Sequence, residues 1–164
     1  QADEPYISTA NIDYLIEKKS LFNNNTTNNN IINLNIINNE LFYMTLHEEN
    51  NSIDYLKSTG SLKLVTDKYN NVLYYSRNII PWNKTNKIIP DYIYKTFTGL
   101  YLFDRNKLKL LKDIDTTPLQ NMEDCEQLKI LENGWKIKSF STIEYNEISL
   151  NTLEDYEYLK KKYT

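Results

Sequence analysis

The segment 61–77, SLKLVTDKYNNVLYYSR, decides how the middle of the chain folds. Two runs rich in aliphatic, aromatic and β-branched residues, 61–67 and 72–77, flank the polar turn Tyr69-Asn70-Asn71. Such a pattern predicts two strands of an antiparallel hairpin. A long strand is also predicted over 94–103, YKTFTGLYLF, because this stretch is rich in aromatic and β-branched residues.

Helices and further strands are expected on both sides of this region. Ser8 is a suitable N-cap for a helix over 8–20, and 41–48 (LFYMTLHE) is typical of a buried strand. Towards the C-terminus the pattern predicts helices over 104–114, 118–132 and 152–163, with a strand over 135–142. Strands interleaved with helices indicate an α/β fold with an inserted antiparallel hairpin.

The helix expected over 118–132 has the clearest boundary signals. Thr117 as N-cap, Pro118 at the first position and Gln120 at the third form a capping-box pattern, and Gly134 follows the end. Asn151 is predicted to cap the last helix in the same manner.

Length and composition exclude several classes of protein. The chain has 164 residues, enough for one domain, with a net charge of −3 that disfavours a nucleic-acid-binding role. Three glycines cannot build a phosphate-binding or dinucleotide-binding loop, and one cysteine and one histidine exclude an internal disulfide, cysteine-cluster zinc sites and most Ser-His-Asp schemes. No apolar run approaches the roughly 20 residues of a membrane-spanning helix.

Two features bear on domain organisation. The Asn-rich, low-complexity stretch 23–39 is expected to be a solvated insertion loop. The chain begins at Gln1 rather than Met, so we expect 1–164 to be a portion of a longer protein.

Four side chains are candidates for chemistry, each with a plainer alternative. Asp3, in the acidic turn QADEP, could hold Mg²⁺ beside a phosphate, or belong to a solvated turn. Arg77, at a predicted strand end, could clamp a carboxylate or phosphate bidentately, or form a surface ion pair. Glu123 and Glu126 are expected to share one helix face, which could simply be solvated.

The single cysteine and the single histidine are assigned no chemical role. Cys125 lies three residues from both Met122 and Leu128, the spacing of apolar residues on one side of a helix. This predicts a buried small hydrophobic residue rather than a nucleophile. His47 falls at the end of a predicted strand without metal-ligand spacing around it.

Several short motifs, taken in order, resemble the 3-deoxy-manno-octulosonate cytidylyltransferases, or CMP-Kdo synthetases, over their C-terminal two-thirds. Residues 1–7, QADEPYI, resemble the family's QGDEPxI, and 73–82, LYYSRNIIPW, resemble ALYFSRxxIPW. Further colinear matches are 62–65 with VKVV, 99–101 with HxGxY, 118–128 with PLEHxExLEQLR, 134–137 with GxxI and 151–155 with DTPEDL.

The resemblance implies a Rossmann-like nucleotide-diphospho-sugar transferase sandwich, present here in part, with a mixed sheet. It also implies that CTP and the sugar acid Kdo are coupled with Mg²⁺ to give CMP-Kdo and pyrophosphate, a step towards lipopolysaccharide. Asp3 matches the family's first metal-binding aspartate, and with Arg77 it is expected to act in catalysis. Gln1, Tyr101, Glu126 and Gln127, like Arg77, fall on the sugar-binding side.

The sequence departs from the family at several polar positions. Asn151 stands where the second metal-binding aspartate is found, and Phe97 and Asn121 replace two histidines. Ala2 replaces a glycine and Asp104 an arginine.

The family's basic nucleotide loop has no counterpart within 1–164. These residues are therefore expected to be a single cytidylyltransferase-like domain without its N-terminal nucleotide-binding half, and inactive alone. Three functions remain open: a Kdo cytidylyltransferase, an enzyme for another acidic sugar such as sialic acid, and a non-catalytic pseudoenzyme or dimerisation scaffold.

The resemblance also implies a homodimer, for which the 61–77 hairpin is a candidate surface. The expected location is cytoplasmic or, in a eukaryote, organellar.

Overall fold

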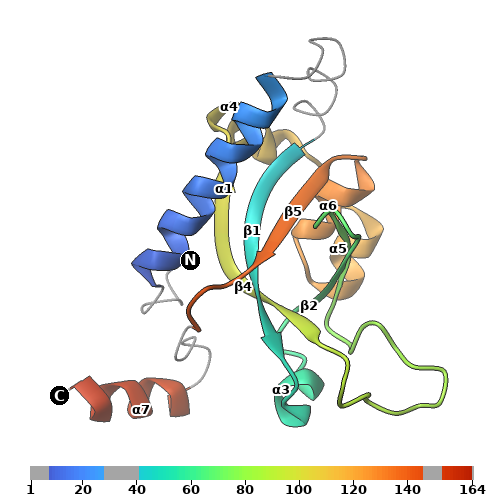
Figure 1. Cartoon of the computed structure of the whole chain (residues 1–164). Helices are drawn as coiled ribbons and strands as arrows, with labels where there is room; N and C mark the ends of the chain where they lie inside the picture. The colour runs from blue at the N-terminus through green and yellow to red at the C-terminus, as the bar shows by residue number, and fades with distance from the viewer. Residues whose placement is uncertain (1–7, 28–40, 146–152, 164) are drawn as a thin grey trace.

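A five-stranded mixed sheet organises the part of the chain that the structure describes, which is 8–27, 41–145 and 153–163. In this computed structural model the strand order is β3-β2-β4-β1-β5 (Figure 1). The strands are β1 (Leu41–Asn50), β2 (Lys63–Thr66), β3 (Val72–Ser76), β4 (Tyr94–Phe103) and β5 (Lys136–Ser141).

The pairing of the strands confirms the predicted fold class. β1 is antiparallel to β4 and parallel to β5, so the sheet is mixed. β2 and β3 form the predicted antiparallel hairpin, which joins the sheet where Lys63 pairs with Thr96. The strand predicted over 94–103 is confirmed at both ends.

The hairpin turn is formed by local side-chain contacts. The Asp67 carboxylate accepts hydrogen bonds from the backbone nitrogens of Tyr69 and Asn71, both at 2.8 Å. Asn70 takes the left-handed conformation with φ 64°, which asparagine tolerates better than most residues. The predicted turn at 69–71 is therefore confirmed.

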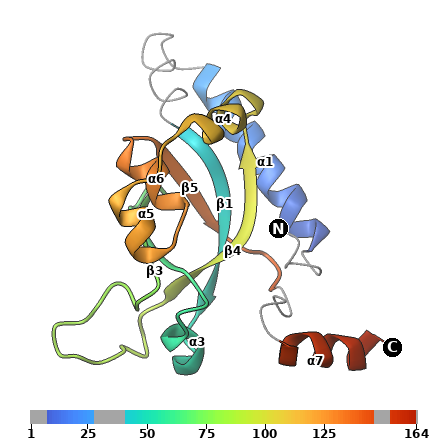
Figure 2. The ribbon, with the colours of Figure 1, turned by 180° about the vertical axis from the view of Figure 1, so that it is seen from behind.

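Helices cover both faces of the sheet (Figures 1 and 2). On one face α1 (Thr9–Thr27) buries Leu15 against Met44 and Leu46. On the other face α5 (Pro118–Glu123) and α6 (Gln127–Glu132) lie over the sheet, and Leu128 packs in one cluster with Tyr75. Burial of each such large apolar side chain contributes about 1.5–3 kcal/mol.

The start of α1 follows the prediction and its end does not. The Ser8 hydroxyl accepts a hydrogen bond from the Ala10 nitrogen at 3.1 Å, as expected of an N-cap. The buried Asn11 side chain joins α1 to the segment after β5 through the backbone oxygen of Glu144 at 2.7 Å. The helix runs to Thr27, so the loop prediction is wrong for 23–27, and 28–40 lie outside the described residues.

The continuous helix predicted over 118–132 is wrong. α5 ends at Glu123, and Asp124 adopts a left-handed φ of 47° before α6 begins at Gln127. Glu123 and Glu126 therefore do not share a helix face.

The capping box predicted for this helix is also wrong. The Thr117 side chain makes no capping hydrogen bond, and its Oγ1 and the Oε1 of Gln120 are buried without a partner. The backbone of Gly134, in contrast, has the positive φ expected after a helix end, at 80°.

The remaining helices are shorter or lie apart. The helix predicted over 104–114 is α4 (Arg105–Leu110), with Asp104 as N-cap, followed by the 3₁₀ turn η1 (Leu111–Asp113). The short α3 (Ile53–Lys57) was not predicted. α7 (Leu153–Tyr163) matches the last predicted helix and lies away from the sheet in both views, whereas its predicted cap Asn151 lies outside the described residues (Figures 1 and 2).

Candidate functional site

Three of the residues expected on the sugar-binding side come together at one pocket. Tyr101 from β4, Glu126 before α6 and Gln127 at the start of α6 line a cavity of about 240 Å³. The rest of the wall is mostly apolar and consists of Tyr43, Phe103, Leu111 and Ile130. We call this cavity the small pocket.

The polar groups of the small pocket are held in defined orientations. The buried Gln127 donates through Nε2 to the Tyr101 hydroxyl, and its Oε1 accepts from the Cys125 thiol at 2.9 Å. Glu126 is exposed to solvent. The pocket therefore offers a phenol, an amide and a carboxylate, groups that can hydrogen-bond to sugar hydroxyls.

An aromatic cluster supports the Tyr101 ring from behind. Its centroid lies 5.3 Å from those of Tyr43 and Phe97, and it stacks on Phe103 at 5.8 Å. Burial raises the pKa of both Tyr43 and Tyr75, whose hydroxyls lie 3.5 Å apart. Both phenols therefore stay neutral.

Arg77 does not line the small pocket. Its guanidinium donates to four backbone oxygens, those of Thr59 (3.1 Å), Gly60 (3.0 Å), Glu123 (3.0 Å) and Asp124 (2.7 Å). It also lies 3.6 Å from the Asp124 carboxylate, which is fully in solvent. The predicted surface ion pair is thus present, but backbone carbonyls take most of the donors.

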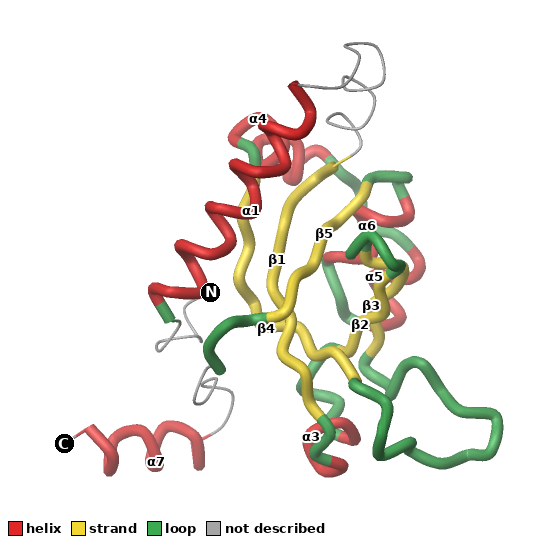
Figure 3. Tube along the Cα trace, viewed as in Figure 1, coloured by secondary structure: helices red, strands yellow, loops and turns green. Residues whose placement is uncertain are grey.

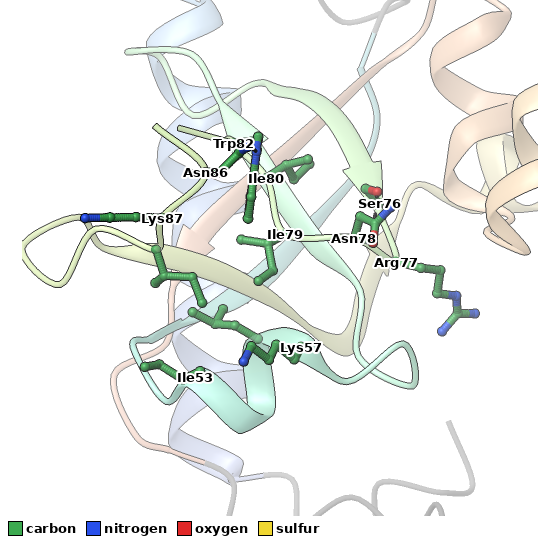
Figure 4. A pocket seen from close by; sticks show the side chains of 12 residues that line it. Ile53, Lys57, Ser76, Arg77, Asn78, Ile79, Ile80, Trp82, Asn86 and Lys87 are labelled. Carbon is green, nitrogen blue, oxygen red and sulfur yellow. Dashed lines mark hydrogen bonds between the residues drawn. The ribbon is translucent and has the colours of Figure 1, made fainter. Parts of the chain in front are cut away.

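A second, larger cavity of about 1000 Å³ lies between α3, the end of β3 and the loop 77–93. This loop projects from the sheet (Figure 3). Its wall is largely apolar and includes Ile53, Leu56, Ile79, Ile80, Trp82 and Ile88. Figure 4 shows Arg77 at its margin, with the guanidinium directed away from the cavity. Of the predicted site residues that the structure describes, Arg77 alone lines this cavity.

Glu123 has a role that the sequence did not indicate. Its carboxylate accepts hydrogen bonds from the Ser76 hydroxyl and from the Arg77 backbone nitrogen, both at 2.8 Å. These partners are 46 and 47 positions away in the chain, so no local pattern could have identified them.

His47 lies within β1, three residues before its end, and is buried. Its Nδ1 lies 2.8 Å from the Ser139 hydroxyl and its Nε2 3.2 Å from that of Ser141, which donates to Glu49 at 2.8 Å. Burial, with a smaller effect of the Lys95 charge, lowers the pKa of His47 to about 4. The alternation of Ser139 and Ser141 along a predicted strand was the available signal, because it places both hydroxyls on one face.

The remaining predicted site residues, Gln1, Asp3 and Asn151, lie outside the described residues. Within the described ranges no three His, Cys, Asp or Glu side chains are grouped so as to hold a metal ion. The same ranges contain no helix long and apolar enough to span a bilayer.

Comparisons with known proteins give a consistent picture. The model of a family described as cytidylyltransferase matches residues 1–139. A protein of Arabidopsis thaliana named 3-deoxy-manno-octulosonate cytidylyltransferase, mitochondrial, is 40% identical over 96 residues, which is 58% of this chain and 33% of that protein. A Fusobacterium nucleatum protein named 3-deoxy-manno-octulosonate cytidylyltransferase is 31% identical over 157 residues, covering 96% of this chain and 56% of that protein.

A solved structure supports the fold. The CMP:2-keto-3-deoxy-manno-octonic acid synthetase complexed with CTP superposes with a TM-score of 0.78 at 19% identity, over 99% of this chain and 58% of that one. The chain thus spans between a third and three-fifths of the relatives named here.

Proposed function

Because the chain belongs to the cytidylyltransferase family, we propose that the full-length protein transfers a cytidylyl group from CTP to 3-deoxy-manno-octulosonate (Kdo), releasing pyrophosphate. The small pocket carries this proposal, since it brings Tyr101, Glu126 and Gln127 to one cavity of about 240 Å³, a size suited to a monosaccharide. We propose that Gln1 belongs to the same sugar-binding set.

The sugar acid also needs a cation for its carboxylate. We propose Arg77, which lies outside the small pocket, so the carboxylate would have to extend beyond the pocket to reach it. The exposed Asp124 carboxylate lies 3.6 Å from its guanidinium, and exposed pairs of this kind contribute about 0–1 kcal/mol. A substrate carboxylate can therefore replace Asp124 at little cost, while the hydrogen bonds to backbone oxygens remain.

The proposed reaction is an in-line displacement. The anomeric hydroxyl of the sugar loses its proton to solvent while its oxygen attacks the α-phosphorus of CTP, a new P–O bond forms, and the bond to the pyrophosphate oxygen breaks with its electron pair. We propose Mg²⁺ as cofactor, with Asp3 as its ligand and Asn151 at the second position; when bound, the ion supplies positive charge to the phosphates.

We further propose that the CTP triphosphate is bound by a region outside 1–164, because the family's basic nucleotide loop has no counterpart in these residues. The 23–39 stretch is proposed to be an insertion. The proposed location is cytoplasmic or organellar.

The first expected result is pyrophosphate release by the full-length protein given CTP, Mg²⁺ and Kdo, with sialic acid as the parallel substrate. Release with Kdo and not with sialic acid is expected. Release with sialic acid alone would reassign the substrate. No release with either sugar, from a protein shown to be folded by circular dichroism, would favour the pseudoenzyme.

We also propose a homodimer in which the β2–β3 hairpin forms part of the contact, because its side chains Tyr69 and Leu73 are 62% and 60% exposed. Light scattering of the full-length protein is expected to give twice the chain mass, and Leu73→Lys is expected to weaken the dimer by about tenfold, a typical loss for an apolar contact residue. A monomeric wild-type protein would contradict this proposal.

A further inference from the structure

We infer that Glu123 is a positioning residue for the small pocket. It fixes the corner between α5 and α6, residues 123–127, and through this corner it places Glu126 and Gln127. The effect on turnover rests on the proposed function, whereas the structural part of the inference does not.

The Glu123 carboxylate joins the end of α5 to the end of β3. One oxygen accepts from the Ser76 hydroxyl and the other from the Arg77 backbone nitrogen, both at 2.8 Å. Ser76 is only 3% exposed. Hydrogen bonds to a charged carboxylate are stronger than neutral ones, and both oxygens are used here.

The Arg77 side chain also binds the corner, as a hydrogen-bond donor to its backbone. It donates to the backbone oxygens of Glu123 and Asp124, carbonyls that the end of α5 leaves without helical partners. Its other donors reach Thr59 and Gly60. Three segments, the end of β3, the turn 58–61 and the corner, are therefore joined around one guanidinium.

A buried lysine stabilises the turn in this arrangement. Lys63 is fully buried, and its Nζ donates to the backbone oxygens of Ser58 (2.7 Å) and Ser61 (2.9 Å). The turn that receives Arg77 is thus fixed from the β2 side as well.

The contacts of Glu123 must exclude a competing conformation of the corner, in which residues 118–132 form one continuous helix. The sequence pattern favours one continuous helix over 118–132, whereas Asp124 is held at a left-handed φ of 47°. For a residue other than glycine this conformation costs about 1–2 kcal/mol. Without the contacts of Glu123, the corner is expected to move towards the continuous helix, which would turn Glu126 and Gln127 away from their present places.

The contact chain continues from the corner into the small pocket. Cys125 is buried, its nitrogen donates to the Gln120 oxygen at 3.1 Å, and its thiol donates to Gln127. Gln127 in turn donates to the Tyr101 hydroxyl. Displacement of the corner would therefore break the hydrogen bond at Tyr101 and expose the Cys125 thiol.

The test compares Glu123→Ala and Glu123→Gln in the full-length protein with Glu17→Gln, an exposed carboxylate on α1, as matched control. The alanine variant is expected to raise the KM for Kdo about tenfold, equal to about 1.4 kcal/mol, with the KM for CTP within about twofold of wild type. The glutamine variant keeps one acceptor oxygen, so a smaller effect is expected.

A second readout does not depend on activity. The rate at which a thiol reagent modifies Cys125, followed by peptide mass spectrometry, is expected to rise about tenfold in Glu123→Ala and to stay at the wild-type value in Glu17→Gln. Burial raises the pKa of this thiol to about 11, so the wild-type rate starts low.

Each outcome decides the matter. An unchanged Cys125 rate in Glu123→Ala would overturn the inference, and so would KM values for CTP and Kdo that rise together, since these would indicate general destabilisation. If the wild-type protein turns over no sugar, the proposed function fails, but the Cys125 rate still shows whether Glu123 holds the corner.

Discussion

Replacement of Asp3 by asparagine in the full-length protein is expected to reduce Mg²⁺-dependent pyrophosphate release about a thousandfold, or about 4 kcal/mol in the barrier. Mg²⁺ binds in proteins through one or two carboxylates together with substrate phosphates. Since the second proposed ligand position carries the neutral Asn151, Asp3 would provide the only carboxylate of the proposed pair. The substitution would leave the ion with two neutral amides.

The control for this experiment is Asp13→Asn, which removes an exposed carboxylate from α1 and is expected to leave turnover unchanged. Titration with Mg²⁺ should show whether high metal concentration restores part of the activity of Asp3→Asn. Wild-type turnover by Asp3→Asn at low Mg²⁺ would remove Asp3 from the mechanism.

The second large effect concerns stability and pH. The folded protein is expected to lose about 3 kcal/mol of unfolding free energy between pH 7 and pH 4 through His47 alone. The pKa of His47 is about 4 in the fold, mainly because of burial, against 6.5 for a free side chain. The unfolded chain therefore binds the proton first as the pH falls. The contribution of His47 to the free energy of unfolding is complete above pH 6.5 and is lost progressively as the pH falls to 4.

The surroundings of His47 explain why the fold does not accept the proton. The ring contacts the hydroxyls of Ser139 and Ser141. The Glu49 carboxylate is hydrogen-bonded to the Ser141 hydroxyl and not to the ring itself. The nearby Lys95 charge also opposes protonation.

Denaturant unfolding at several pH values, for wild type and His47→Gln, measures this effect. The variant is expected to be less stable at pH 7 and to lack the histidine part of the slope between pH 6.5 and 4. Identical slopes for the two proteins would show that His47 does not titrate in this way.

Local patterns predicted the strands well. The hairpin 61–77 and the strand 94–103 were predictable because alternation, β-branched residues and the Asp67-to-Asn71 turn act within a few residues of each other. The order of the strands was not predictable from the same patterns, since it depends on pairing between β1 and β5, far apart in the chain.

The failures have a common physical origin. The pattern over 118–132 favoured one helix, and the break at Asp124 depends on contacts of Glu123 with Ser76 and Arg77, which lie on another element. The capping box failed in the same region: the Thr117 side chain makes no capping hydrogen bond.

The site was predicted in part. The family resemblance predicts Tyr101, Glu126 and Gln127 on the sugar-binding side, and the structure brings them to one pocket. Their roles remain predictions. The backbone partners of Arg77 and the hydroxyls around His47 could not be predicted, because each pairs residues that are close only after folding.

The parallel pairing of β1 with β5 has a consequence for how the protein is made. His47 and Ser139, which meet across these strands, are 92 positions apart, whereas the β2–β3 hairpin closes within a few residues. Pairing between strands so far apart in the sequence is slow, because the long segment between them must first lose conformational entropy. During synthesis the hairpin can form early, but the edge of β1 that pairs with β5 stays open until β5 has left the ribosome, and an unpaired strand edge favours aggregation in that interval.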